Sequence, residues 1–244
     1  MHAGRYVWLF PMVASLLLAT AAVAQTRPTV LELFTSQGCS SCPAADRLFK
    51  SYIGRRDVIA LSFNVDYWDY LGWKDTLAKS SFSERQRFYA RQRGDGAVYT
   101  PQMVVNGVDH AIGSRQAEID AAIRRSWKKL KTAKLRLDTT TTEDRFVIAI
   151  KHEGEPLKRP ATVWLASVEP KVTVRIQRGE NRGSTATYYN VVREIAAVGM
   201  WPGHATTIEV RQRSYLKKPG MRCVVLVQAD SGAILAASWL NQAR

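Results

Sequence analysis

The stretch Val30-Leu31-Glu32-Leu33-Phe34-Thr35-Ser36-Gln37-Gly38-Cys39-Ser40-Ser41-Cys42-Pro43 carries the strongest structural signal in this chain. Its first five residues form a mostly apolar run of strand length, and the polar residues and glycine that follow interrupt the run. Pro43 suits the first turn of a helix, because the amide hydrogen that proline lacks would have no partner inside the helix there. The stretch therefore predicts a strand, a tight turn and a helix, with two cysteines where the helix begins.

Cys39 and Cys42 are separated by two residues at the start of the predicted helix. The helix dipole and the free backbone amides stabilise a thiolate at this position, and the thiolate is the nucleophilic form of cysteine. We interpret Cys39 as the more exposed, attacking cysteine and Cys42 as the cysteine that resolves a mixed disulfide. Two other interpretations stay open, namely a structural disulfide in a short loop or half of a metal site. Zinc would normally need a second Cys/His pair, which the chain lacks.

Residues 1–24 match the pattern of an export signal. A weakly basic start precedes an apolar run from Val7 to Ala19, and Ala22-Val23-Ala24 has the small-x-small form of a cleavage site. An uncleaved membrane anchor is the alternative, although the run is barely long enough to span a membrane. We expect a mature protein that begins at Gln25, is periplasmic or secreted, and has no membrane span after signal cleavage.

The chain has a formal net charge of +14 and three cysteines in 244 residues. Such a charge could favour acidic partners, anionic membranes or nucleic acid. The basic residues are scattered, however, and an exported protein seldom meets nucleic acid, so we expect no nucleic-acid partner. Three cysteines are too few for a disulfide scaffold. Cys223 lies in an apolar strand pattern and is expected to be a buried, inert side chain.

Further elements follow the cysteine pair. Residues 57–65 form a nearly continuous apolar run, which is typical of a strand covered on both faces. Residues 80–94 read as a helix that stops at a glycine, and residues 114–130 read as an amphipathic helix. Between these helices, Asn106-Gly107 separates two short strands, which is a strong hairpin signal.

The connection from Asp66 to Asp75 contains four aromatic residues and three carboxylates. It follows the carboxyl end of a predicted strand, the side of an open α/β sheet where sites form. We interpret Tyr67, Trp68 and Trp73 as a candidate lip that contacts substrate. A small satellite core that covers the sheet edge explains the same aromatic residues equally well.

The order of these elements, with the Cys39–Cys42 pair and a Thr100-Pro101 step that opens the third strand, resembles the thioredoxin fold over residues 28–131. The resemblance implies a cis Thr100–Pro101 peptide bond against the cysteine pair, and a backbone edge at Thr100 that positions an extended substrate. Thioredoxins also keep a buried, proton-carrying carboxylate on the first strand. Glu32 is the nearest match, offset by one residue, and a solvent-facing Glu32 without such a role is the alternative.

The chain as a whole also resembles a narrower group, the exported bacterial thioredoxin-like proteins of unknown function. The match is carried by residues 33–43, 65–73 and 99–102 and by the loop Gly179-Glu180-Asn181-Arg182-Gly183. That loop reads either as a docking element or, more simply, as an ordinary turn. Gly38 stands where thioredoxins usually place tryptophan, and Ser-Ser replaces Gly-Pro between the cysteines. These departures leave the direction of electron flow open.

From Lys134 the pattern changes to short alternating strands with turns rich in Gly, Pro, Asn and Asp, which suggests an antiparallel sandwich. The predicted strands are 135–139, 146–151, 162–167, 172–177, 187–195, 206–211, 223–229 and 234–239. The predicted fold class is an α/β thioredoxin-like domain over residues 25–131, followed by a mostly antiparallel, β-sandwich-like domain over residues 132–244.

Two hypotheses of function follow. In the first, the protein is an exported thiol–disulfide oxidoreductase that uses Cys39 and Cys42 on protein or peptide thiols, without a cofactor and with an unidentified redox partner. In the second, it is a non-enzymatic thioredoxin-like binding or Cu(I)-handling module. The two cysteines would then be soft ligands for Cu(I), with His110 as the only nearby candidate for a third ligand.

Overall fold

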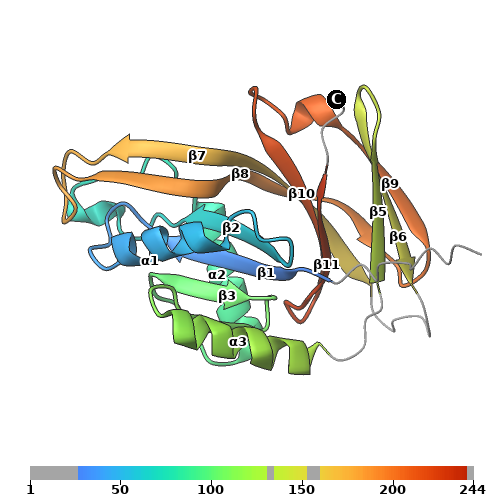
Figure 1. Ribbon diagram of the computed structural model, residues 1–244, viewed down its shortest axis with the longest axis horizontal. Coiled ribbons are helices and arrows are strands. Elements are labelled where there is room, and N and C mark those ends of the chain that lie inside the picture. Colours follow the sequence, from blue (N-terminus) through green and yellow to red (C-terminus); the bar gives the residue numbers. More distant parts are fainter. Residues whose placement is uncertain (1–26, 131–134, 153–159, 241–244) are drawn as a thin grey trace, which may run out of the picture.

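The computed structural model describes residues 27–130, 135–152 and 160–240 (Figure 1). The predicted export signal therefore lies outside the described residues. The elements are β1 (Thr29–Thr35), α1 (Cys42–Phe49), β2 (Val58–Asn64), α2 (Ser80–Arg93), β3 (Gln102–Val105), β4 (Asp109–Ile112), α3 (Gln116–Lys129), β5 (Leu135–Thr141), β6 (Arg145–His152), β7 (Ala161–Arg175), β8 (Thr185–Trp201), β9 (Thr206–Arg211), β10 (Arg222–Ala229) and β11 (Ile234–Leu240), with short 3₁₀ turns at Lys50–Tyr52, Asp69–Leu71 and Gln212–Ser214.

Strands from both halves of the chain form one mixed sheet. Its eight strands are ordered β11-β10-β7-β8-β2-β1-β3-β4, and β5-β6-β9 form a separate three-stranded sheet. β1 pairs parallel with β2 and antiparallel with β3. β8 joins the two halves, because it pairs parallel with β2 at Ser62 and Val191 and antiparallel with β7 over most of its length.

The predicted fold class is wrong. Strand accounts for 44% and helix for 22% of the described residues, so the protein is mostly β, with a large mixed sheet and few helices, and not a thioredoxin-like α/β domain followed by a separate sandwich-like domain. The physical reason is that the strands of the second half do not pair only with one another. β8 hydrogen-bonds to the free edge of β2 and continues the same sheet. The predicted boundary at residue 131 falls in a segment, 131–134, outside the described residues and stays a prediction.

Helices cover both faces of the first half of the large sheet. Alternate residues of a strand point to opposite faces. Leu31 and Leu33 of β1 therefore pack with α1 and α3 in one core. Val30 and Phe34 pack with the α2 side chains Phe82 and Tyr89 in another, which continues under β7, β8 and β10. Among the described residues, no helix combines the length and the apolar character needed to cross a membrane.

The small sheet packs against the β7, β10 and β11 part of the large sheet. Their shared core includes the fully buried residues Phe146, Ile148, Val163, Leu165 and Val225. Cys223 lies in this core as a free cysteine, as expected. Burial raises the pKa of its thiol to about 12, so Cys223 is not a nucleophile near neutral pH.

The hairpin formed by β7 and β8 extends beyond the rest of the sheet. We call residues 169–191 of this hairpin the arm; in Figure 1 it extends to the left, over α1. Two strands were predicted at 162–167 and 172–177, whereas β7 is one strand of 15 residues. Pro170 does not interrupt β7, because β10 pairs only as far as Val168. Beyond that residue β7 is an edge strand, where a proline removes no ladder hydrogen bond.

Candidate redox site

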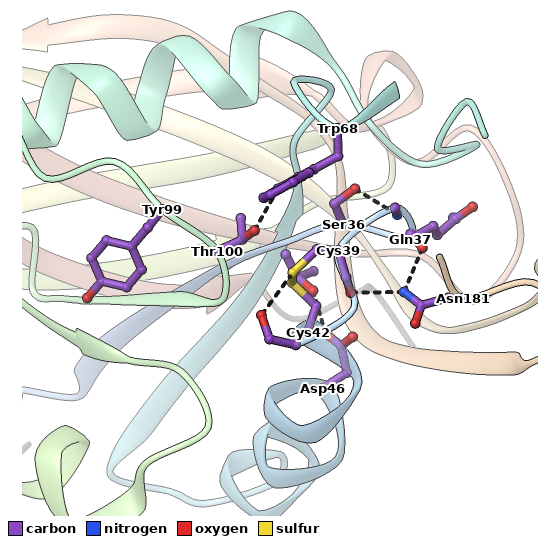
Figure 2. Close-up of a disulfide and its surroundings, with 12 residues drawn as sticks. Ser36, Gln37, Cys39, Cys42, Asp46, Trp68, Tyr99, Thr100 and Asn181 are labelled. Atoms are coloured by element: carbon purple, nitrogen blue, oxygen red, sulfur yellow. Dashed lines mark hydrogen bonds between the residues drawn. A yellow bond between two sulfur atoms is a disulfide. The ribbon is translucent and has the colours of Figure 1, made fainter. Parts of the chain in front are cut away.

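Cys39 and Cys42 form a disulfide at the start of α1 (Figure 2). Their Cα atoms are 5.4 Å apart. A compact turn places them there, because the amide of Cys39 donates to the carbonyl of Ser36 (3.3 Å) and the amide of Cys42 donates to the carbonyl of Cys39 (3.2 Å). Pro43 occupies the first turn of α1 as predicted. The cysteine pair thus lies where the unpaired amides of a helix can stabilise a thiolate.

The disulfide is covered. Cys39 is 2% exposed and Cys42 is fully buried, so Cys39 is the more exposed of the two, as expected, but both sulfurs are largely shielded from solvent. Trp68 packs against the turn beside Cys39. A Cβ atom on Gly38 would lie only 3.0 Å from the Cβ of Trp68, so a side chain at position 38 would crowd Trp68. The glycine that departs from the thioredoxin pattern therefore makes room for Trp68.

Thr100 and Pro101 lie beside the cysteine pair. The Thr100–Pro101 peptide bond is cis, as expected. The indole Nε1 of Trp68 donates to Oγ1 of Thr100 at 2.7 Å, and Figure 2 shows this contact on one side of the disulfide. A Cβ on Gly113 would lie 3.2 Å from the Cβ of Pro101 and 3.3 Å from the Cβ of Ala45 in α1. The proline is therefore next to the first turns of the helix that carries Cys42.

Only one of the three candidate lip residues lies over the site. Trp68 covers the turn beside Cys39, whereas the indole of Trp73 donates to Oε1 of Gln37 at 2.8 Å. The hydroxyl of Tyr67 donates to Oε1 of Gln86 on α2 at 3.1 Å. The connection from Asp66 to Asp75 thus holds the loops around the disulfide, and contact of its aromatic residues with substrate stays a prediction.

Glu32 lies on the other face of the sheet from α1. It is fully buried, and its carboxylate accepts hydrogen bonds from Nε of Arg85 (2.9 Å) and from the hydroxyl of Tyr89. Both partners belong to α2, and Gln228 of β10 contacts them in turn. The structure therefore places Glu32 in a buried ion pair and does not bring it to the disulfide.

A different carboxyl group lies under the cysteines. Asp46 is in α1, four residues after Cys42, and this spacing puts both side chains on the same face of the helix. Asp46 is 6% exposed and accepts a hydrogen bond from Oγ1 of Thr35 at 2.9 Å. Burial, with a smaller contribution from the charge of Asp75, raises the pKa of Asp46 to about 8. Our sequence reasoning missed Asp46, although its spacing from Cys42 was a usable signal.

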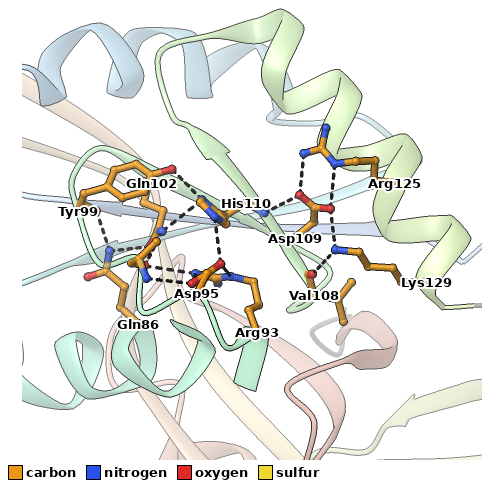
Figure 3. Close-up of polar contacts among 11 residues, drawn as sticks. Gln86, Arg93, Asp95, Tyr99, Gln102, Val108, Asp109, His110, Arg125 and Lys129 are labelled. Atoms are coloured by element: carbon orange, nitrogen blue, oxygen red, sulfur yellow. Dashed lines mark hydrogen bonds and ion pairs between the residues drawn. The ribbon is translucent and has the colours of Figure 1, made fainter. Parts of the chain in front are cut away.

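His110 is held in a separate polar cluster (Figure 3). Its Nδ1 lies 2.8 Å from the hydroxyl of Tyr99, and its Nε2 lies 3.3 Å from Oδ2 of Asp95. Both ring nitrogens thus have protein partners. Within residues 27–130, 135–152 and 160–240, no group of three or more His, Cys, Asp or Glu side chains is arranged to hold a metal ion. His110 is therefore not placed as a third ligand beside Cys39 and Cys42.

The second half of the chain also contributes to the site. The side-chain nitrogen of Asn181 donates to the carbonyl of Gln37 and to the carbonyl of Cys39, both at 2.9 Å (Figure 2). Asn181 lies at the tip of the arm, in the loop Gly179–Gly183. This loop is an ordinary turn in its backbone, and it also docks on the turn that carries Cys39.

Comparisons with known proteins give a family and a fold. The family described as "Protein of unknown function (DUF1223)" matches residues 30–228. The crystal structure of protein AGR_C_4864 from Agrobacterium tumefaciens is similar, with 34% sequence identity, a TM-score of 0.76, and 90% of this chain and 97% of that chain covered. HBP35 of Porphyromonas gingivalis shares the fold at 13% identity, with a TM-score of 0.60 and coverages of 88% and 74%. No curated protein matches the chain. Membership of the thioredoxin superfamily is not confirmed by these matches.

Proposed function

Because the chain belongs to the DUF1223 family, a family of unknown function, we propose its activity from its own site: thiol–disulfide exchange through Cys39 and Cys42. The observation that carries the proposal is a disulfide at the first turn of α1 with a buried carboxyl group, Asp46, one turn further along the same helix face. We interpret this carboxyl group as a proton carrier, which favours exchange over a purely structural disulfide. We further propose that the protein acts on protein or peptide thiols outside the cytoplasm, which the pattern of residues 1–24 supports.

The exchange proceeds in two steps. In the reduced protein, the thiolate of Cys39 attacks one sulfur of an external disulfide, and the other sulfur leaves as a thiolate. Cys42 then loses its proton, attacks the sulfur of Cys39 and releases the second external thiol. The external disulfide is thereby reduced to two thiols, and the protein dithiol is oxidised to the disulfide. With an external dithiol as reactant, the same steps run in reverse.

Asp46 is the proposed proton carrier for Cys42. A buried thiol must lose its proton before it can attack, and a base works best when its pKa is near the working pH. Burial raises the pKa of Asp46 to about 8, so the carboxyl group can both accept and return a proton near neutral pH. The position of Asp46 on the same face of α1 as Cys42 supports this role.

The cover over Cys39 must open during exchange. The Trp68–Thr100 hydrogen bond closes one side of the site, and a single hydrogen bond contributes about 0.5–1.5 kcal/mol. This hydrogen bond therefore adds only a small part of the free energy that opening the site requires. We propose that an extended substrate segment then contacts the backbone edge at Thr100.

The direct test is catalysis of insulin reduction by dithiothreitol. We expect the wild-type protein to accelerate the precipitation of insulin chains at catalytic concentrations. Correctly folded protein that leaves this rate unchanged, and that also exchanges no disulfides with glutathione, would contradict the proposal. The Cu(I) alternative is not favoured, because no described histidine is placed beside the cysteines.

Asp46→Asn tests the raised pKa of Asp46. Between about pH 4 and about pH 8, the folded protein keeps a proton on Asp46 that the unfolded chain has lost. The stability of the wild-type disulfide form should therefore fall as pH rises through this window, by at most about 1.4 kcal/mol per pH unit from this group. The amide side chain of the variant cannot ionise, so the variant should lack this decline.

The measurement is the free energy of unfolding in urea at several pH values between about 4 and 9. Asp230→Asn, which changes an exposed aspartate in the β10–β11 turn, is the matched control and should keep the wild-type decline. If Asp46→Asn and the wild type show the same pH dependence, Asp46 does not carry a raised pKa.

A further inference from the structure

The tip of the β7–β8 arm is a preformed element. Within it, the amide of Gly183 donates to the carbonyl of Ile176 (2.8 Å), and the amide of Ile176 donates to the carbonyl of Ser184 (3.0 Å). The hydroxyl of Ser184 donates to the carbonyl of Asn181 at 2.7 Å. The backbone of Asn181 is thus fixed by bonds within the tip, and its side chain is left to contact the rest of the protein.

The arm is also anchored to the first half of the chain along its length. Tyr188 packs with Leu77, which follows the aromatic connection. Tyr189 packs against the core under α1, with Nζ of Lys50 5.8 Å from its ring. At the tip, a Cβ on Gly179 would lie 3.1 Å from the Cβ of Trp73. The contact between Asn181 and the cysteine turn is therefore made by a supported element.

Asn181 satisfies both carbonyls that the cysteine turn presents to the arm. Its amide nitrogen carries two hydrogens, and two acceptors lie at 2.9 Å, the carbonyl oxygens of Gln37 and Cys39. Without this donor, the carbonyl of Gln37 would lose the contact with Asn181, and the carbonyl of Cys39 would keep only its bond from the amide of Cys42 (3.2 Å), so the negative ends of both dipoles would be less compensated. A negative potential there disfavours a thiolate on the same residue.

We propose that Asn181 is a positioning residue for the Cys39–Cys42 couple: its amide holds the cysteine turn against the arm, keeps the Cys39 sulfur at the start of α1 and so favours the reduced, thiolate form. This inference rests on the proposed exchange function, and it assigns a role to the second half of the chain. The contacts join residues more than 140 positions apart in the sequence, so no local pattern encodes them.

Asn181→Leu removes the donor and keeps a similar side-chain volume. The pH midpoint for alkylation of Cys39 by iodoacetamide should move up by about half a unit to one unit. The equilibrium with glutathione should shift toward the protein disulfide by about 3- to 10-fold, which corresponds to about 15–30 mV for a two-electron couple. Asn181→Asp, which places a carboxylate against the two carbonyls, should shift both quantities in the same direction.

Thr173→Ala is the matched control in the same arm. It removes an exposed hydroxyl contact with Thr187 (3.2 Å) and leaves the cysteine turn untouched, so neither quantity should change. The proposal is overturned if Asn181→Leu or Asn181→Asp folds normally and keeps the wild-type midpoint and equilibrium, or if Thr173→Ala shifts them equally. If Asn181→Leu does not fold, Asn181→Asp decides alone.

Both readouts are independent of any substrate. The alkylation midpoint and the glutathione equilibrium can be measured even if wild-type protein fails to accelerate insulin reduction. In that case, a shifted midpoint and a shifted equilibrium in Asn181→Leu would still support the positioning role of Asn181, although the proposed oxidoreductase function would be wrong. The two claims are therefore tested separately.

Discussion

Cys39→Ser is expected to abolish the acceleration of insulin reduction. Serine cannot form the mixed disulfide with which the exchange begins, and Cys42 is fully buried behind it. We expect the rate of insulin reduction with this variant to equal the rate with dithiothreitol alone. The measurement is the turbidity of precipitating insulin chains at equal protein concentration.

Cys223→Ala is the matched control for this result. Cys223 is a free cysteine, buried in the core between the two sheets, and its raised pKa keeps its thiol protonated. Removal of this sulfur should leave the exchange rate within about twofold of the wild type, although some stability is lost through the smaller side chain. If Cys39→Ser keeps the wild-type rate, another group carries the activity and our assignment of Cys39 is wrong.

Arg85→Met is expected to destabilise the protein by about 3–5 kcal/mol. Arg85 and Glu32 form an ion pair in which both side chains are almost fully buried, with exposed fractions of 7% and 1%. Arg85 also donates to the hydroxyl of Tyr89 at 2.7 Å. Loss of the guanidinium leaves the carboxylate of Glu32 buried without a cation, and such a charge is costly. The measurement is the free energy of unfolding in urea.

Two controls separate this effect from a general sensitivity to mutation. Arg55→Met breaks an exposed pair with Asp57 and should cost less than about 1 kcal/mol. The double variant Glu32→Gln with Arg85→Met leaves no unpaired charge and should be more stable than Arg85→Met alone. If the free energy of unfolding of Arg85→Met lies within about 1 kcal/mol of the wild-type value, the buried ion pair does not stabilise the protein as its geometry indicates.

Local elements were predictable from local patterns. The apolar run, turn and proline around the cysteines correspond to β1 and α1, and Gly94 ends α2 with a positive φ. At the β3–β4 hairpin, Asn106 and Gly107 both have positive φ values, as a tight hairpin turn requires. A Cβ on Gly107 would also lie 1.9 Å from the carbonyl oxygen of Gly232, so close packing excludes any other residue there.

The order of strands in the sheet was not predictable in the same way. The free edge of β2 can accept any strand of suitable length, and the pattern of β8 does not say which edge it joins. The predicted fold class was wrong for this reason. It took a change from helical to alternating patterning at Lys134 for the start of a separate fold, whereas β8 pairs with β2 in one sheet. The domain boundary itself stays a prediction.

The site was partly predictable. The spacing of Cys39 and Cys42 and the Thr100-Pro101 step indicated it, but Glu32 was chosen from the resemblance alone, and the face of α1 that carries Asp46 was not considered. The cover by Trp68 and the donor from Asn181 depend on contacts between distant segments. Such contacts arise from packing of the whole sheet, so a single sequence carries no direct signal for them.

Trapping of a mixed disulfide tests the central claim most directly. Cys42→Ser protein, reduced and then mixed with oxidised glutathione, is analysed by intact-mass and peptide mass spectrometry. We expect one glutathione per chain, attached to Cys39, because the resolving sulfur is gone and Cys223 is buried and protonated. A folded Cys42→Ser protein whose Cys39 acquires no adduct would contradict the assignment of Cys39 as the attacking thiol.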